Sequence, residues 1–131
     1  MKLCLSLLPL LALAGCNLEP IHLSPCSVQG RLGFRVHEIE GLLWDYQPRP
    51  SWIVVRGERS SPVWMAHING LERLENRPER PVLLYAQRLT EWEVDVPAKR
   101  LRDGTKYRVF LNDGGRSGET YFTAGAPMPT C

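Results

Sequence analysis

Residues 101–111, LRDGTKYRVFL, combine a turn signal with a strand that alternates between apolar and polar side chains. The turn signal is Arg102-Asp103-Gly104, and the apolar positions are Tyr107, Val109 and Leu111. Successive side chains of a strand point to opposite faces, so a period of two predicts a strand with one buried face. Glycine permits the backbone conformations of a tight turn, which places a change of chain direction before the strand.

Similar strand patterns recur along the chain. Residues 69–76 fit only a turn or two of helix, with Leu71 and Leu74 inward and Pro78 at its end, and no window shows a long helical period. The strand-like runs are separated by turn signals and occupy residues 28–36, 52–56, 62–68, 82–89, 91–96, 106–111 and 119–123. Seven short strands at this spacing predict a single all-β sandwich domain.

Residues 101–109 resemble the approach to strand F of fibronectin type III and related immunoglobulin-like domains. In those domains a leucine, a glycine and a tyrosine form the tyrosine corner, whose phenol hydrogen-bonds to backbone a few residues upstream. The resemblance assigns these roles to Leu101, Gly104 and Tyr107, and it implies an immunoglobulin-like or fibronectin type III-like sandwich of about seven strands. It leaves the usual core tryptophan unassigned among Trp44, Trp52, Trp64 and Trp92.

Residues 1–15 have the pattern of an export signal. Lys2 precedes an apolar stretch over residues 3–13, and Leu13-Ala14-Gly15-Cys16 supplies small residues at a cleavage site. About eleven apolar residues extend only ~17 Å as a helix, too short for a ~30 Å hydrocarbon core. LAGC resembles the lipobox of bacterial lipoproteins, which implies cleavage before Cys16 and a diacylglyceryl group on its thiol. The alternative is an ordinary cleaved signal followed by a chance cysteine.

The residue after the modified cysteine carries an address in bacterial lipoproteins. An aspartate there resembles an inner-membrane retention signal; this chain has Asn17, which implies transfer to the outer membrane, facing the periplasm, in a Gram-negative source. The acyl chains of such a modification together anchor a protein firmly. The predicted organisation is a signal peptide over 1–15, a lipidated tether over 16–25 and a β-sandwich domain over 26–131.

Two cysteines remain once the signal is removed and Cys16 is acylated, namely Cys26 and Cys131. Exported proteins meet an oxidising compartment, so this pair is predicted to form one disulfide that ties down the last residue. An intermolecular bond and a free thiol are the alternatives. Neither cysteine belongs to a C-x-x-C motif, which argues against redox catalysis.

Motifs for catalysis and cofactor binding are missing from the sequence. His37-Glu38 begins like the zinc-protease helix motif, but residue 41 is glycine, and His22, His37 and His67 lack metal-ligand spacing. Cleavage before Cys16 leaves fifteen basic and fourteen acidic side chains, without the clustered basic surplus of a nucleic-acid binder. We therefore expect no enzyme, no cofactor, no metal site and no nucleic-acid partner.

Residues 41–52, GLLWDYQPRPSW, have the composition of a protein-binding surface. Aromatic side chains and arginine dominate the hot spots of protein interfaces. The alternative is that these aromatic side chains fold over the end of the sandwich as part of its core. The residues predicted to bind a partner are Trp44, Tyr46, Arg49 and Trp52.

Charged side chains gather at two further places. Residues 71–80, LERLENRPER, mix both signs and form either a second contact surface or a solvated loop. Glu91, Glu93 and Asp95 fall on one strand face, where they form either an acidic patch or an ordinary solvated face.

These features favour two classes of function. The first is a non-enzymatic protein-binding module held on the membrane by its lipid. Within that class, the layout of lipobox, short tether, single β-domain and late cysteine is similar to that of periplasmic immunity lipoproteins of type VI secretion systems, which bind a toxin delivered into the periplasm. The second class is a structural or assembly role, as an accessory subunit of an envelope complex.

Overall fold

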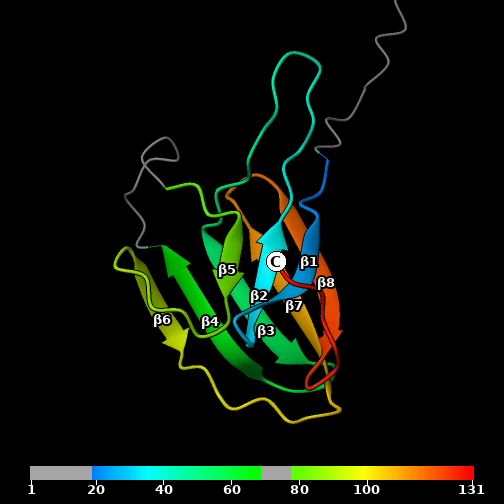
Figure 1. Cartoon of the computed structure of the whole chain (residues 1–131). Helices are drawn as coiled ribbons and strands as arrows, with labels where there is room; N and C mark the ends of the chain where they lie inside the picture. Colours follow the sequence, from blue (N-terminus) through cyan, green and yellow to red (C-terminus); the bar gives the residue numbers. More distant parts are fainter. Residues whose placement is uncertain (1–18, 69–77) are drawn as a thin grey trace, which may run out of the picture.

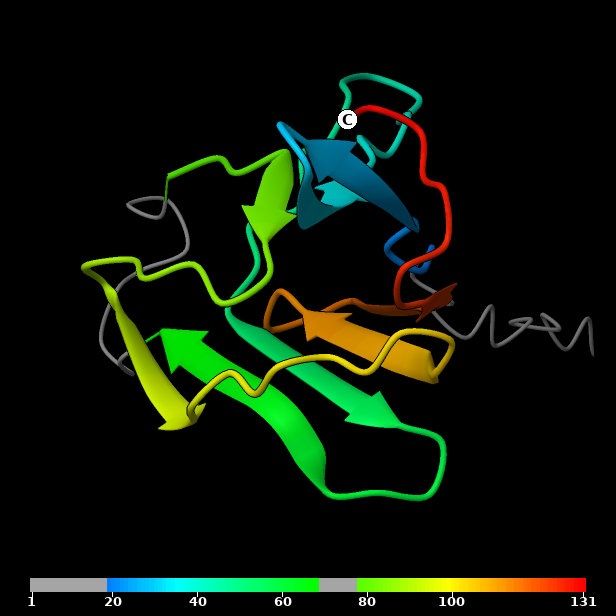
Figure 2. The same cartoon turned by 60° about the horizontal axis from the view of Figure 1, so that its bottom comes forward.

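Two antiparallel β-sheets pack face to face in the computed structural model, which describes residues 19–68 and 78–131 (Figure 2). One sheet has three strands in the order β1-β2-β5, and the other has five in the order β6-β4-β3-β7-β8 (Figure 1). The predicted all-β sandwich is confirmed, whereas the helical turn expected at residues 69–76 lies outside the described residues. The strands are β1 (Leu23–Val28), β2 (Arg31–Val36), β3 (Trp52–Gly57), β4 (Pro62–Ile68), β5 (Val82–Leu84), β6 (Trp92–Val96), β7 (Lys106–Asn112) and β8 (Ser117–Thr123).

The order of the strands is that of an immunoglobulin-like sandwich. β1, β2 and β5 share one sheet as strands A, B and E do, and β3, β7 and β8 lie side by side in the other as strands C, F and G do. β4 extends the second sheet beyond β3, and β6 adds an edge strand beside β4. This order agrees with the resemblance of residues 101–109 to the approach to strand F.

Eight strands are present where the sequence pattern predicts seven, because residues 28–36 contain a hairpin turn. Gln29 and Gly30 have φ angles of 50° and 76° and form the two-residue connection between β1 and β2. Positive φ at both central residues matches the right-handed twist of the flanking strands. The alternating pattern does not reveal this turn, because glutamine rarely adopts a positive φ.

The first strand begins upstream of residue 26, at which the predicted domain starts. β1 begins at Leu23 and includes Pro25, whose missing N–H is tolerated at the edge of a sheet. Upstream of β1, Ile21 is buried, and its N–H donates to the Ser117 carbonyl at 2.9 Å. Fewer residues of the chain therefore separate Cys16 from the first ordered contact than the predicted tether contains.

Aromatic side chains from both sheets meet in the core. Phe34 on β2 lies 5.6 Å from Phe122 on β8, and Phe122 stacks on Tyr107 of β7 at 5.4 Å between ring centroids. Trp64 on β4 is 3% exposed and packs edge-on against Tyr85 at 5.3 Å. Trp64 is therefore the tryptophan that the core encloses.

A tyrosine corner forms where the chain enters β7. The Tyr107 hydroxyl accepts a hydrogen bond from the Arg102 N–H at 3.0 Å, five residues upstream. Gly104 has a φ of 80°, a conformation that favours glycine, and its N–H donates to the Ala124 carbonyl at 2.8 Å. Leu101 is partly buried against the core. These are the contacts that the resemblance of residues 101–109 predicts.

The C-terminal residues are held against β1 by a disulfide and by backbone hydrogen bonds. Cys26 and Cys131 are bonded, with their Cα atoms 4.9 Å apart. The Cys131 N–H donates to the Ser27 carbonyl at 3.0 Å, and Ser27 N–H donates to the Pro129 carbonyl at 2.8 Å. Because the bond spans 105 residues, it stabilises the fold by on the order of 4–5 kcal/mol in the chain-entropy description. The segment also covers part of the open edge of β1.

We predict that Tyr107→Phe lowers the free energy of unfolding by about 1 kcal/mol or more, because the Arg102 N–H loses its acceptor. Chemical denaturation measures this loss. Tyr121→Phe is the matched control, since Tyr121 is 44% exposed on β8. Equal stability of the two variants would show that the corner hydrogen bond contributes nothing.

Candidate functional site

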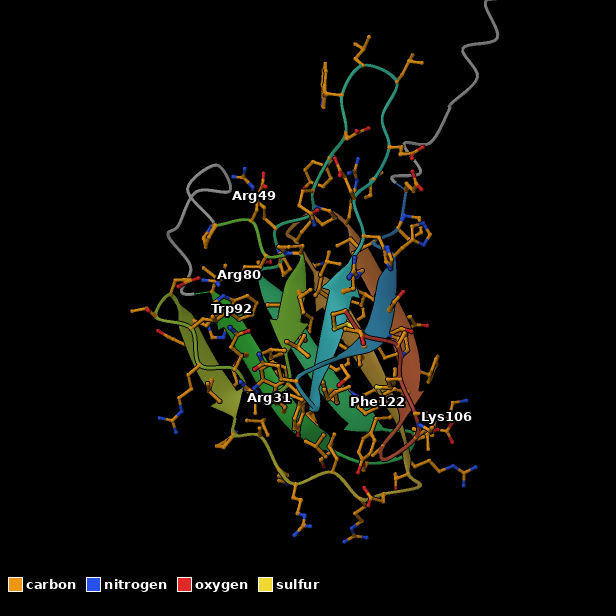
Figure 3. All side chains as sticks on the ribbon, viewed as in Figure 1. Arg31, Arg49, Arg80, Trp92, Lys106 and Phe122 are labelled. Carbon is orange, nitrogen blue, oxygen red and sulfur yellow. A yellow bond between two sulfur atoms is a disulfide. The ribbon has the colours of Figure 1, made fainter. Side chains whose placement is uncertain are left out.

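A hairpin between β2 and β3 carries three large apolar side chains into solvent. Ile39 and Tyr46 pair through two backbone hydrogen bonds of 2.7 and 2.8 Å, which close residues 40–45 into a protruding loop (Figure 1). Leu42, Leu43 and Trp44 are 100%, 80% and 72% exposed, and together they are called the hairpin tip. Figure 3 shows side chains pointing outward from the end of this loop, away from the sheets.

The turn of the hairpin requires glycine at its start. A Cβ atom on Gly41 would lie 2.0 Å from the Trp44 carbonyl oxygen, which is closer than two non-bonded atoms can approach. A larger residue therefore does not fit at this position. The backbone is therefore folded tightly on itself, which leaves the side chains of the hairpin tip no space inside the turn. The tight turn that begins at Gly41 therefore leaves the side chains of the hairpin tip in solvent.

Tyr46 fastens the base of the hairpin to the turn between β7 and β8. Its hydroxyl donates to Asp113 Oδ2 at 2.7 Å, and the Arg116 guanidinium lies 4.5 Å above its ring. Asp113 is 4% exposed, and its Oδ1 accepts from the N–H groups of Gly115 at 3.0 Å and Arg116 at 2.6 Å. Burial, followed by the hydrogen bond to the Asp113 carboxylate and its charge, raises the pKa of Tyr46 to about 12. Tyr46 is therefore a neutral donor with a structural role.

Two other side chains of the predicted surface have different neighbours. Arg49 donates to the Glu79 carboxylate at 3.4 Å, beside the base of the hairpin (Figure 3). Trp52 is the first residue of β3, is 39% exposed and packs edge-on against Phe110 of β7 at 5.5 Å. Trp44, Tyr46, Arg49 and Trp52 thus do not form one surface, because Trp44 is exposed at the hairpin tip and Trp52 lies on the sheet.

The outer face of the five-stranded sheet has a hollow of about 250 Å³ with an aromatic and basic lining. β3 alternates, with Ile53 and Val55 in the core and Val54 on the opposite face. Val54 is nevertheless only 2% exposed, because larger side chains surround it. The residues that line the hollow, here called the outer-face patch, are Trp52, Val54, Arg56, Arg108 and Phe110.

Polar side-chain pairs border the outer-face patch on both sides. Toward β8, the Arg108 Nε donates to the Glu119 carboxylate at 2.7 Å. Toward β6, His67 Nδ1 lies 2.7 Å from Asp95 Oδ2, and His67 Nε2 lies 3.6 Å from Glu93 Oε2. The patch therefore has an apolar and aromatic centre with a polar rim, which is the anatomy of a protein interface.

Glu91 is separated from the other two carboxylates of the predicted acidic face. It precedes β6 and accepts a hydrogen bond from the Arg80 guanidinium. That hydrogen bond lowers the pKa of Glu91. Glu93 and Asp95 instead share His67 as a neighbour. The three carboxylates consequently belong to two separate groups of contacts.

A second hollow of about 550 Å³ opens beside β6 and is lined by apolar side chains, among them Trp64, Leu89 and Trp92. Within residues 19–68 and 78–131, no three His, Cys, Asp or Glu side chains lie together as a metal site would require. Most of the charged segment 71–80, like Cys16, lies outside the described residues.

Sequence reasoning misses four members of the outer-face patch, namely Val54, Arg56, Arg108 and Phe110. The alternation of the two strands could have revealed them. Residues 54 and 56 of β3 and residues 108 and 110 of β7 occupy the positions between the core residues, so they face away from the core. The pairing of Val54 with Phe110 and of Arg56 with Arg108 brings the two strands' outer residues together.

No family model, curated protein or solved structure matches this chain. In the described part of the chain, no helix is both long and apolar enough to cross a bilayer.

Proposed function

We propose that the protein is a lipid-anchored lipoprotein of the cell envelope that acts as a non-enzymatic protein-binding module through its outer-face patch. The observation that carries this proposal is the hollow that Trp52 and Phe110 line together with two arginines. Tryptophan and arginine are the residue types most enriched in interface hot spots. The strand pairs of β3 and β7 hold these side chains in place, so little side-chain freedom is lost on binding.

The perturbed tyrosines support a binding role in preference to catalysis. Tyr46 and Tyr85 both have a pKa raised to about 12, mainly because they are partly buried. Tyr85 donates to the Lys99 carbonyl at 2.7 Å, as Tyr46 does to Asp113. Both phenols remain protonated at neutral pH and hold loops to the sandwich. General bases and nucleophiles need pKa values close to the operating pH, which neither phenol has.

The lipobox supports a membrane anchor at Cys16, and Asn17 supports an outer-membrane address facing the periplasm in a Gram-negative source. The Cys26–Cys131 disulfide supports an oxidising compartment, where such bonds persist. An acyl anchor would hold the binding module at the membrane surface, where it could diffuse only along the membrane plane. A partner that arrives in the periplasm would then meet it at a high local concentration.

Within this class we propose an immunity role, in which the outer-face patch binds a secreted toxin. The layout of lipobox, short tether, single β-domain and late cysteine supports this role. A rigid sandwich with one preformed patch would suit a stoichiometric inhibitor, which needs affinity but no turnover. An accessory subunit of an envelope complex is the alternative, and the identity of the captured protein separates the two.

We predict that Cys16→Ser abolishes incorporation of labelled palmitate and moves the protein from the membrane to the soluble fraction of its host. The sulfur atom of Cys16 would carry the lipid, and a serine hydroxyl cannot take its place. Cys4→Ser is the matched control, because Cys4 would leave with the signal peptide. Labelling that survives Cys16→Ser, or that Cys4→Ser removes, would contradict the proposed anchor.

We predict that Trp52→Ala lowers affinity for the partner by roughly 2 kcal/mol or more, about thirtyfold, because it removes an aromatic side chain from the outer-face patch. Capture from detergent-solubilised envelope with mass-spectrometric identification finds the partner, and titration of the purified pair measures the affinity. Trp44→Ala is the control, since it removes a tryptophan from the hairpin tip instead. A single toxin favours the immunity role, and a fixed set of envelope proteins favours the accessory role. Unchanged affinity after Trp52→Ala would exclude the patch.

A further inference from the structure

The hairpin tip is the most exposed apolar feature of the described residues. Leu42, Leu43 and Trp44 are 100%, 80% and 72% exposed, whereas the other large exposed hydrophobic side chains of the described part are between 39% and 46% exposed. The tip is convex, because the tight turn at Gly41 directs its side chains outward. It is also separate from the outer-face patch, so the proposed partner does not explain it.

The hairpin and the N-terminal segment lie at the same end of the sandwich. Leu23, the first residue of β1, pairs with Val36, the last residue of β2, so the chain enters β1 where it leaves β2 for the hairpin. The His37 N–H donates to the His22 carbonyl at 3.0 Å, which continues this pairing toward the N-terminus. Figure 1 shows the hairpin and the blue N-terminal segment reaching toward the same end.

Only a few residues of the sequence separate Cys16 from this end. Ile21 is fixed to Ser117 by a backbone hydrogen bond of 2.9 Å. Five residues of chain span at most ~18 Å when fully extended. A lipid carried by Cys16 therefore brings the membrane surface to within a short distance of the end that bears the hairpin tip.

We propose that the hairpin tip inserts into the interfacial region of the lipid bilayer that holds the acyl anchor. The proposal rests on the acylation of Cys16 in the proposed function. Tryptophan prefers the boundary between headgroups and acyl chains, and leucine side chains are stabilised in the acyl region. A convex apolar tip needs no matching pocket in a lipid surface, which deforms around it, whereas a protein partner would need a complementary groove.

Charge and rigidity define the kind of membrane contact. Glu40 and Asp45 flank the tip, and their carboxylates would stay at the level of the headgroups. They disfavour a strongly anionic surface, so a mainly zwitterionic leaflet is the expected target. The Ile39–Tyr46 backbone pair and the Tyr46–Asp113 hydrogen bond hold the hairpin in position before it meets the bilayer. Insertion therefore costs little ordering of the loop.

Insertion would orient the whole domain. An acyl chain on a flexible segment allows the domain to rotate, and a second contact at the hairpin tip removes much of that freedom. The strands would then stand with their hairpin end toward the membrane. The outer-face patch, which lies along β3 and β7, would remain open to a partner in the periplasm.

The test uses the acylated full-length mature protein in phosphatidylcholine vesicles whose acyl chains carry bromine, a short-range quencher of tryptophan fluorescence. We expect bromine-dependent quenching in the wild type and in Trp52→Ala, and loss of most of it in Trp44→Ala. Trp64, which is 3% exposed, and the partly buried Trp92 are present in every variant and form a common background. Circular dichroism confirms that each variant is folded.

Absence of quenching in a wild type that mass spectrometry shows to be acylated would overturn the proposal. Equal quenching in Trp44→Ala and the wild type would do the same. Loss of partner capture in Trp44→Ala, without quenching in the wild type, would identify the tip as a protein-binding site instead. If the protein carries no acyl chain, the proposed function fails separately, and quenching of the unacylated protein at high lipid concentration then decides whether the tip binds lipid by itself.

Discussion

The antiparallel pairing of β1 with β2 determines which segments of the chain leave the sandwich at the same end. Because Leu23 is opposite Val36, the N-terminal segment and the β2–β3 hairpin must leave the sheet at one end. The other edge of β1 receives the C-terminal segment, through the bridge between Ser27 and Thr130 and through the Cys26–Cys131 disulfide. A single strand pair thus places the proposed lipid, the apolar hairpin tip and the chain terminus relative to one another.

The fold is largely predictable from local patterns, because β7 contains the tyrosine corner and its alternation is unbroken from Tyr107 to Leu111. The β1–β2 hairpin is not, since its turn places a glutamine at positive φ. The candidate site is predictable only in part. Residues 41–52 read as one aromatic segment, yet they run from the hairpin tip through its base to the start of β3. Phe110 joins Trp52 through the register of β3 and β7, which no local pattern reveals.

The two surfaces suit different partners because their shapes differ. The outer-face patch is a hollow with an aromatic floor and a charged rim, which is suited to a protein side chain. The hairpin tip is a projection whose apolar side chains have no walls around them, which is suited to a deformable lipid surface. Tyr46 keeps these surfaces in a constant relation, because it binds the hairpin to the β7–β8 turn and remains protonated at neutral pH.

Amide hydrogen exchange of the acylated protein, with and without zwitterionic vesicles, tests the shared orientation of anchor and hairpin most directly. The register of β3 with β7 places residues 57–61 at the end opposite the hairpin, so they serve as the internal reference. Vesicles are predicted to slow exchange at residues 40–45 and to leave residues 57–61 unchanged. Unaltered exchange at 40–45, or slowing at 57–61, would contradict a domain that meets the membrane with its hairpin end.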